Sequence, residues 1–170
     1  MILFETERLY IEEAQPKDID EIIAMENHKE NRKYIWQGTV EQHMAEIADP
    51  NHLLMMFRDR DSRQTKGFAL IGLDFKSNVF EIRRIAITDK GKGYGKEAMK
   101  GLIKYAFEET ETNRVWLDVY TDHQVGIRLY ESLGMHRDGV LRQSYLSDRG
   151  YLDQIIYSML RSEYENNLLW

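Results

Sequence analysis

Two kinds of apolar pattern alternate in the N-terminal half of the chain. Apolar and polar residues alternate over Arg8–Ala14, which predicts a strand. Three further strand-like runs begin at Leu53, Gly67 and Val79, and short polar turns join them. Short polar connections between such runs favour hairpins, so the three runs are predicted to form an antiparallel meander.

Between the first strand and the meander the apolar residues have helical spacing. Pro16 precedes the sequence DIDE, which begins at Asp18 and has the form of a capping box. This pattern predicts the start of a helix. A second capping box, Thr39-x-x-Gln42, predicts another helix that ends before Pro50.

The C-terminal half begins with a helix, because five apolar residues after the meander fall at helical spacing. These residues are Ala98, Met99, Leu102, Ile103 and Ala106. Arg114–Tyr120 predicts a strand, a short helix follows and ends at Gly134, and a long hairpin closes the chain. The order β-α-α-β-β-β-α-β-α-β-β predicts a mixed α/β (α+β) fold. Its helices pack on a mainly antiparallel sheet, in one domain over residues 1–170.

Composition narrows the class of protein. The chain has 170 residues, 42% of them hydrophobic, which is enough for a full core without disulfides. It has no cysteine, so thiolate metal sites and a cysteine nucleophile are excluded, and its formal net charge is −6. An acidic chain disfavours nucleic acid as a partner. We see no signal peptide and no membrane span, and we expect a cytoplasmic protein.

The stretch DKGKGYGK, residues 89–96, lies between a predicted strand and a predicted helix. Glycines let the backbone approach a ligand closely, and a helix N-terminus offers free N–H groups and partial positive charge. Together with three lysines these features favour a phosphate-binding site. The alternative is a glycine turn that only caps the helix.

Two well-known phosphate motifs fail on this stretch. The P-loop needs G-x-x-x-x-G-K-[ST], but Lys90 stands at its first glycine and Glu97 at its last position. The dinucleotide fingerprint G-x-G-x-x-G fails as well, since a start at Gly91 puts Lys96 at the last glycine. Neither an ATP-type nor an NAD-type site is therefore predicted.

The same stretch resembles motif A of the GNAT N-acetyltransferase superfamily, [QR]-x-x-G-x-[GA], with Lys90 where Gln or Arg is usual. The preceding EIRRIAI, the following helix and GIRLYESLGM stand in the family's order and spacing. The opening TERLYIEEAQPKDIDEI and the closing DGVLRQSYLSDRGYLDQIIYSML resemble the branch of ribosomal-protein and spermidine acetyltransferases. The resemblance covers nearly the whole chain.

The resemblance implies a sheet with two splayed strands, helices on both faces, and direct acetyl transfer from acetyl-CoA to an amine without a metal. The pantetheine arm would pair with one strand and the pyrophosphate would lie on the glycine run. The implied cofactor-binding residues are Arg83, Arg84, Ile85, Lys90, Gly91, Lys92, Gly93, Tyr94, Gly95, Lys96, His123, Gly126 and Tyr130. His123 stands at the family's usual Asn, where it could cap the helix, touch CoA or titrate. Gly126 replaces the usual Ala, which could loosen the helix.

The resemblance also suggests catalytic roles. Tyr130 matches the family's general acid, which protonates the departing sulfur, and a phenol with a pKa of about 10 is protonated at neutral pH. The alternative for Tyr130 is an aromatic packed on a helix. Backbone N–H near Ile85 could stabilise the oxyanion. Glu81 is a candidate base by position alone, and its alternative is an ion pair with Arg83 or Arg84.

Candidates for contact with the amine lie in the predicted N-terminal helices, their loop and the closing hairpin. They are Glu26, Asn31, Tyr34, Trp36 and Tyr145, and for any single one of them the favoured alternative is ordinary surface or core. The acceptor could be a small amine, a polyamine or a protein N-terminus. Family members are often dimers, so a homodimer is also expected. Two other functions remain open: a non-catalytic CoA-binding sensor and another phosphate-anchored transferase.

Overall fold

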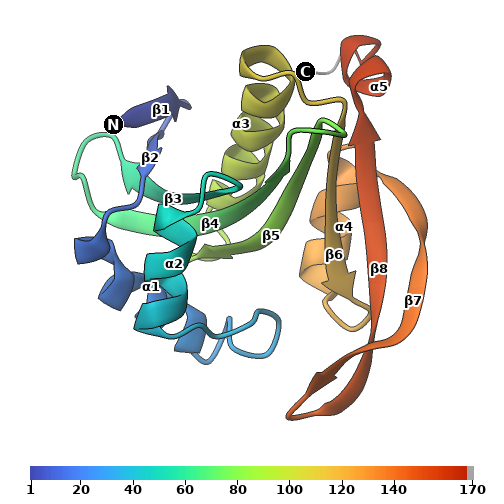
Figure 1. Ribbon diagram of the computed structural model, residues 1–170, viewed down its shortest axis with the longest axis horizontal. Helices are drawn as coiled ribbons and strands as arrows, with labels where there is room; N and C mark the ends of the chain where they lie inside the picture. Colours follow the sequence, from blue (N-terminus) through green and yellow to red (C-terminus); the bar gives the residue numbers. More distant parts are fainter. Residues whose placement is uncertain (168–170) are drawn as a thin grey trace.

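The computed structural model describes residues 1–167 and has one eight-stranded sheet with helices on both faces (Figure 1). The strands are β1 (Ile2–Glu5), β2 (Leu9–Glu13), β3 (His52–Asp59), β4 (Thr65–Asp74), β5 (Val79–Ile87), β6 (Arg114–Tyr120), β7 (His136–Ser147) and β8 (Gly150–Leu160). The helices are α1 (Ile19–Asn27), α2 (Val40–Ala48), α3 (Tyr94–Glu109), α4 (Gln124–Ser132) and α5 (Arg161–Glu165), with a short 3-10 turn at Pro16–Asp18. Within these residues no helix is long and apolar enough to cross a membrane.

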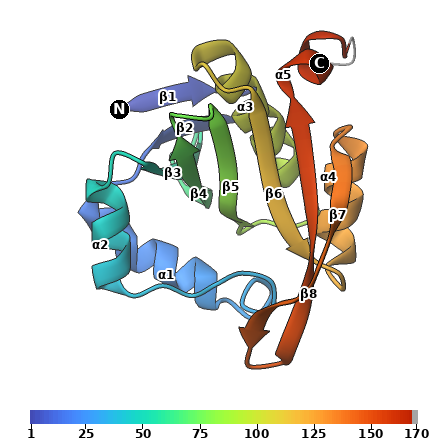
Figure 2. The same ribbon diagram turned by 45° about the vertical axis from the view of Figure 1, so that its right-hand side comes forward.

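The strands run in the order β1-β2-β3-β4-β5-β6-β8-β7, and every neighbouring pair is antiparallel except β5 and β6. The parallel pairing of β5 with β6 covers a few residues and ends at Glu81 and Trp116. Beyond that point the two strands diverge, as Figure 2 shows. The sheet is therefore open in its middle, where its two halves separate.

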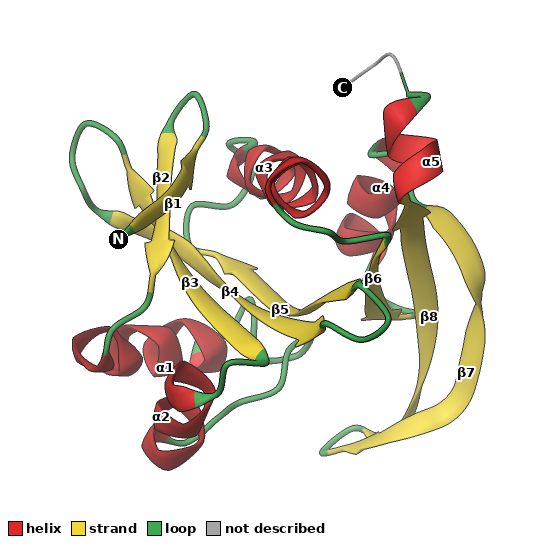
Figure 3. Cartoon of the chain, turned by 45° about the horizontal axis from the view of Figure 1, so that its top comes forward, coloured by secondary structure: helices red, strands yellow, loops and turns green. Residues whose placement is uncertain are grey.

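Each face of the sheet has its own apolar core. The larger core joins the sheet to α3 and α4, with fully buried residues such as Met99, Leu102 and Val115. The smaller core lies under α1 and α2 and includes Ile22 and Phe68. Figure 3 shows these helix pairs on opposite sides of the sheet. Burial on both faces explains why β4 is apolar at nearly every position instead of alternating.

The predicted elements occur in the predicted order, and the mixed, mainly antiparallel fold with helices on both faces is confirmed. The Thr39 capping box forms in both directions, and Gly134 ends α4 with a φ of 83°. The prediction of a capping box beginning at Asp18 is wrong. The carboxylate of Asp18 accepts hydrogen bonds from Gln15 N–H and Arg58 instead, which places Gln15 at the cap.

Two short elements were not predicted from the sequence. Strand β1 has four residues and helix α5 has five, too few for a period to appear in the apolar pattern. Both lie at the ends of the chain, and tertiary contacts stabilise them. Phe4 of β1, for example, stacks on Tyr105 of α3 with ring centroids 5.1 Å apart.

Candidate active site

The alternation of side chains between the two faces of the sheet is interrupted at one residue of strand β5. Ile82 is paired with Ile71 of β4, and Arg84 is paired with Leu70, so Arg83 is an extra residue in a β-bulge. The bulge turns Arg84 toward the face that α1 and α2 cover. Bulges often redirect a side chain beside a functional site. Here the bulge follows directly after β5 and β6 separate.

Two cavities meet where β5 and β6 separate. The strand cavity, about 270 Å³, lies between β5 and β6 and reaches the α1–α2 loop and the β7–β8 hairpin. The loop cavity, about 460 Å³, lies along the glycine run and the starts of α3 and α4. Residues common to both are Tyr34, Ile35, Ile85, His123 and Tyr130. A long ligand can therefore enter through one cavity and present its end to the other.

The glycine run forms one wall of the loop cavity from backbone. Gly91 and Gly93 have φ of 78° and 82°, a conformation that favours glycine. Gly93 is the N-cap of α3, so the unpaired N–H groups of the first turn open on the cavity. The lining includes every predicted residue of the run except Lys92, whose carbonyl accepts a hydrogen bond from Arg8. The structure thus does not bring the Lys92 side chain to this wall.

Lys90 lines the loop cavity and is bonded within it. Its Nζ donates a 2.6 Å hydrogen bond to Oδ1 of Asn31, which in turn donates to the carbonyl of Met25. Burial lowers the pKa of Lys90. Asn31, expected to contact the amine, is 6% exposed and lines the loop cavity, not the strand cavity. The structure therefore associates Asn31 with the predicted CoA side.

His123 caps α4 with its ring. Its Nδ1 accepts a hydrogen bond from the N–H of Gly126, and its ring stacks on Tyr34 with centroids 3.9 Å apart. Burial, with the charge of Lys90, lowers the pKa of His123 to about 4, so the ring is neutral at pH 7. A Cβ at Gly126 would lie 3.1 Å from this ring, so the glycine makes room for the histidine. Gly126 itself lines neither cavity.

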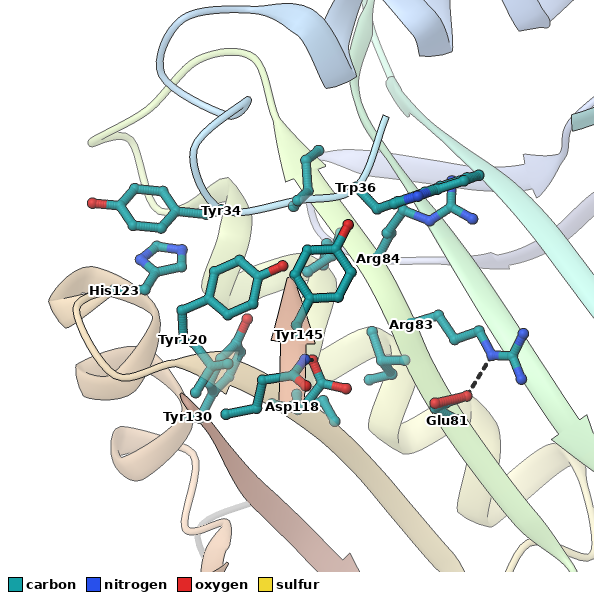
Figure 4. Close-up of a pocket in the computed structure, with 16 residues that line it drawn as sticks. Tyr34, Trp36, Glu81, Arg83, Arg84, Asp118, Tyr120, His123, Tyr130 and Tyr145 are labelled. Atoms are coloured by element: carbon teal, nitrogen blue, oxygen red, sulfur yellow. Dashed lines mark hydrogen bonds and ion pairs between the residues drawn. The ribbon is translucent and has the colours of Figure 1, made fainter. Parts of the chain in front are cut away.

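Tyr130 stands where the cavities join. It projects from α4, is 7% exposed, and lines both cavities (Figure 4). Its hydroxyl has no hydrogen-bond partner among residues 1–167. Burial raises the pKa of Tyr130 to about 12, with a further contribution from the charge of Asp118. The hydroxyl is therefore protonated at neutral pH and free to donate to a ligand.

Glu81 lies in the strand cavity but is already paired. Its carboxylate accepts a 2.5 Å hydrogen bond from Nε of Arg83. Nη1 of Arg83 also lies 2.9 Å from Nε2 of His52, whose Nδ1 is 2.8 Å from Asp49. The ion pair with Arg83, one of the two alternatives left open for Glu81, is therefore present, and the same residue lines the strand cavity.

Asp118 is a second carboxylate in the strand cavity, and it was not among the residues predicted from the sequence. It is exposed on the cavity wall, and Oδ1 accepts a 2.9 Å hydrogen bond from Nε2 of Gln154. The surrounding walls, with the charge of Glu81, raise the pKa of Asp118 to about 6. One signal in the sequence could have revealed it, since Asp118 is an acid inside the otherwise apolar stretch VWLDVY.

Arg84 belongs to a closed network behind the strand cavity. Its guanidinium pairs with Glu26 at 2.8 Å and Glu46 at 2.9 Å, and His43 joins the same two carboxylates. Glu26 is fully buried, also accepts the N–H of Gly38, and lines neither cavity. The structure therefore does not bring Glu26 to the amine, because all its contacts are internal.

Aromatic rings form the remaining walls of the strand cavity. Trp36 covers the guanidinium of Arg84 at 4.5 Å from the ring centroid. Tyr145 of β7 stacks on Tyr120 of β6 with centroids 5.9 Å apart. With Tyr34, these rings line the strand cavity, and aromatic rings attract ammonium groups. The predicted residues Tyr34, Trp36 and Tyr145 are thus brought together.

The tip of the β7–β8 hairpin is tied across the molecule to the α1–α2 loop. Arg149 donates from Nη1 to Asp122 at 2.5 Å and from Nη2 to the carbonyl of Lys33 at 3.0 Å. In Figure 2 the hairpin reaches toward this loop below the sheet. This contact links the hairpin that carries Tyr145 to the loop that carries Tyr34. No cluster of three metal-binding side chains occurs in the part of the chain that the structure describes.

Comparisons with known proteins point to one family. The family described as an acetyltransferase (GNAT) domain matches residues 8–136. A prophage-derived uncharacterized N-acetyltransferase of Bacillus subtilis is 35% identical over 78 residues, 46% of this chain and 44% of its own length. A spermine/spermidine N(1)-acetyltransferase of the same species is 32% identical over 83 residues, 44% and 55% of the two lengths. The chain thus matches about half the length of each of these relatives.

A solved structure extends the comparison over the whole sheet. The crystal structure of spermidine N-acetyltransferase from Vibrio cholerae in complex with CoA and spermine has a TM-score of 0.83 and 19% identity to this chain. The match covers 94% of this chain and 99% of that one. At this identity the likeness concerns the fold alone. The splayed arrangement predicted for β5 and β6 is confirmed by their own pairing, which ends at Glu81 and Trp116.

Proposed function

This chain belongs to the GNAT acetyltransferase family, and we propose that it moves an acetyl group from acetyl-CoA directly to a primary amine. One observation carries the proposal. Tyr130, whose hydroxyl forms no hydrogen bond among the described residues, stands where a backbone-lined cavity meets a side-chain-lined one. Such a junction suits a reaction in which two substrates must meet at one proton donor.

Acetyl-CoA is assigned to the loop cavity. Its pyrophosphate would accept hydrogen bonds from the amides of residues 90–96, at the positive end of α3. Lys90 and Lys96 line this cavity and would add positive charge. Beyond Glu81 the β5 backbone has no pairing with β6, so the pantetheine arm would pair with Arg83, Arg84 and Ile85 there.

The thioester would then lie beside Ile85 and Tyr130, which line both cavities. Backbone N–H near Ile85 would stabilise the oxyanion that forms when the amine attacks. The Tyr130 hydroxyl would protonate the departing sulfur. Two carboxylates of the strand cavity, Glu81 and Asp118, are within reach of the incoming amine and could take its proton.

The strand cavity favours a small cationic amine such as a polyamine. Its lining combines two carboxylates with aromatic rings, and both features attract ammonium groups. Its arginines, Arg83 and Arg84, are neutralised by their own ion pairs, so they do not repel a cation strongly. The solved Vibrio cholerae relative contains CoA and spermine, which supports the same class of acceptor.

Thiol release from acetyl-CoA, measured with spermine, spermidine, simple monoamines and peptides with a free N-terminus, tests the proposal. We expect release with at least one cationic amine and acetyl-CoA binding by calorimetry. Tyr130→Phe should lower kcat about 100-fold or more and leave acetyl-CoA affinity unchanged, since the phenol acts on the leaving group. Binding without release for any amine would favour the CoA-binding sensor. Absence of CoA binding would contradict both functions.

A further inference from the structure

The two carboxylates of the strand cavity have hydrogen-bond partners of different charge. Glu81 is bonded to the cation of Arg83, which is itself fixed by His52. Asp118 is bonded to the neutral amide of Gln154 and forms no ion pair among the described residues. An ammonium group entering the cavity would therefore compete with Arg83 for Glu81, whereas it would find Asp118 without a cation.

The position of Asp118 also suits contact with the reacting nitrogen. Asp118 and Tyr130 line the same cavity, and the charge of Asp118 influences the Tyr130 hydroxyl. Figure 4 places Asp118 below Tyr145, with Tyr130 to one side and the linked Arg83–Glu81 pair to the other. A nitrogen held at Asp118 would therefore lie in the same cavity as the Tyr130 side chain.

On the basis of the proposed function, we propose that Asp118, oriented by Gln154, binds the ammonium form of the acceptor and takes its proton, while Glu81 holds Arg83 in the bulge. The charged and titratable groups that line the cavity with Asp118 are Glu81, Arg83 and Arg84 on β5, Tyr120 on its own strand, His123 and Tyr130 at α4, Tyr145 on β7 and Tyr34 on the α1–α2 loop. The cations of this lining, Arg83 and Arg84, are paired with other carboxylates, so neither forms an ion pair with Asp118. Its pKa of about 6 keeps it ionised at pH 7 yet basic enough to accept a proton.

The step balances in protons and electrons. The N–H bond of the ammonium breaks, its proton goes to the Asp118 carboxylate, and the nitrogen keeps the electron pair. That pair forms the new bond to the acetyl carbon. The C–S bond then breaks, and sulfur takes the hydroxyl proton of Tyr130. The nitrogen releases its second extra proton to water, Tyr130 regains a proton from water, and Asp118 gives its proton to water. One proton is released in total for each acetyl group moved.

The test compares Asp118→Asn with Glu81→Gln, two neutral substitutions of nearly unchanged shape. Calorimetry gives the affinity for spermine and for acetyl-CoA, and thiol release gives kcat/KM for spermine from pH 5 to 9. We expect wild-type kcat/KM to fall below about pH 6, where Asp118 becomes protonated. Asp118→Asn should lower kcat/KM about 100-fold or more, abolish this acidic limb and weaken spermine binding. Glu81→Gln should keep the acidic limb.

The outcomes separate this assignment from acetyl transfer itself. If the wild type turns over and Asp118→Asn keeps both its rate and its acidic limb, the Asp118 assignment is overturned and acetyl transfer stands. The Asp118 assignment is also overturned if Glu81→Gln removes the limb. If the wild type binds spermine and acetyl-CoA without releasing thiol, acetyl transfer is overturned, and the proton-accepting role of Asp118 with it. Unchanged acetyl-CoA affinity in both variants verifies that they fold.

Discussion

The loop cavity and the strand cavity share five residues but are built in different ways. The loop cavity owes one wall to the glycine run, residues 89–96 without Lys92, whose glycines expose backbone N–H groups at the start of α3. The strand cavity is assembled from side chains on β5, β6, β7, β8, α4 and the α1–α2 loop. A backbone site of this kind tolerates changes in side-chain chemistry, whereas a side-chain site depends on the network behind it. Damage to one cavity should therefore leave ligand binding in the other intact.

The strongest test of this separation is Glu26→Gln, behind the strand cavity. The substitution leaves the cations Arg84 and His43 facing one buried carboxylate, Glu46. Breaking a buried ion pair costs about 3–5 kcal/mol, so the free energy of unfolding should fall by that amount. Urea unfolding measures the loss, and the exposed Glu41→Gln on α2 is the matched control.

The same variant tests whether the cavities are independent. Because Glu26 lines neither cavity, Glu26→Gln should reduce acetyl-CoA affinity less than about twofold while the protein remains folded. Spermine affinity should fall, since Arg84 and the Trp36 ring above it lose their support. A destabilisation below about 1 kcal/mol would contradict the closed network, and a parallel loss of acetyl-CoA affinity would contradict the separation.

The network behind the strand cavity should also make stability depend on pH. Burial opposes a charge on His43, but its hydrogen bonds to Glu26 and Glu46 and their charges outweigh it and raise the pKa to about 9. Because the pKa of His43 is higher in the folded state, its protonation contributes the full stabilisation below about pH 6.5, the unfolded pKa. This contribution is lost as the pH rises from 6.5 to 9. The expected loss is on the order of 2–3 kcal/mol.

Unfolding free energies measured from pH 6 to 10 test this dependence on His43. The wild type should lose stability over the window from 6.5 to 9, and His43→Leu should be less stable but nearly flat there. A slope that persists in His43→Leu would assign the dependence to another group. Acetyl-CoA affinity should not follow this curve, because no residue of the network except Arg84 lines a cavity.

Acetyl-CoA affinity at the loop cavity should depend most on the backbone conformation of the glycine run. Gly93 has a φ of 82°, which costs a β-branched residue about 1–2 kcal/mol. Gly93→Val should therefore displace the amides that open on the cavity and weaken acetyl-CoA binding roughly 10- to 100-fold, which calorimetry measures. Spermine affinity should remain within about twofold of the wild type, since Gly93 does not line the strand cavity.

Gly139→Val is the control for this substitution. Gly139 lies on β7, and a Cβ there meets no atom within 4 Å. It should leave acetyl-CoA affinity unchanged, which shows that loss of a glycine alone is not the cause. Equal acetyl-CoA affinity in Gly93→Val and the wild type would contradict the backbone cradle.

The difference between the cavities also explains what the sequence could predict. The glycine run, the flanking elements and Tyr130 follow one another in a fixed order, so local patterns were enough to locate the loop cavity. The bulge at Arg83 is invisible in the sequence, because it depends on the register between β4 and β5. For the same reason the burial of Glu26 and the accessibility of Asp118 were missed, since both depend on contacts between residues far apart in the chain.

The smallest effect is expected at His123, which lines both cavities, and at Gly126 beside its ring. The family signature has Asn and Ala there, and in this chain the ring occupies the space beside a missing Cβ. Gly126→Ala alone adds helix propensity of about 1 kcal/mol but meets the ring at 3.1 Å, so the change in unfolding free energy should be near zero. The double variant His123→Asn/Gly126→Ala should have an unfolding free energy about 0.5–1 kcal/mol higher than the sum of the two single changes predicts. Strict additivity in this double-mutant cycle would mean that the two departures from the signature are energetically independent and that the ring does not require the glycine.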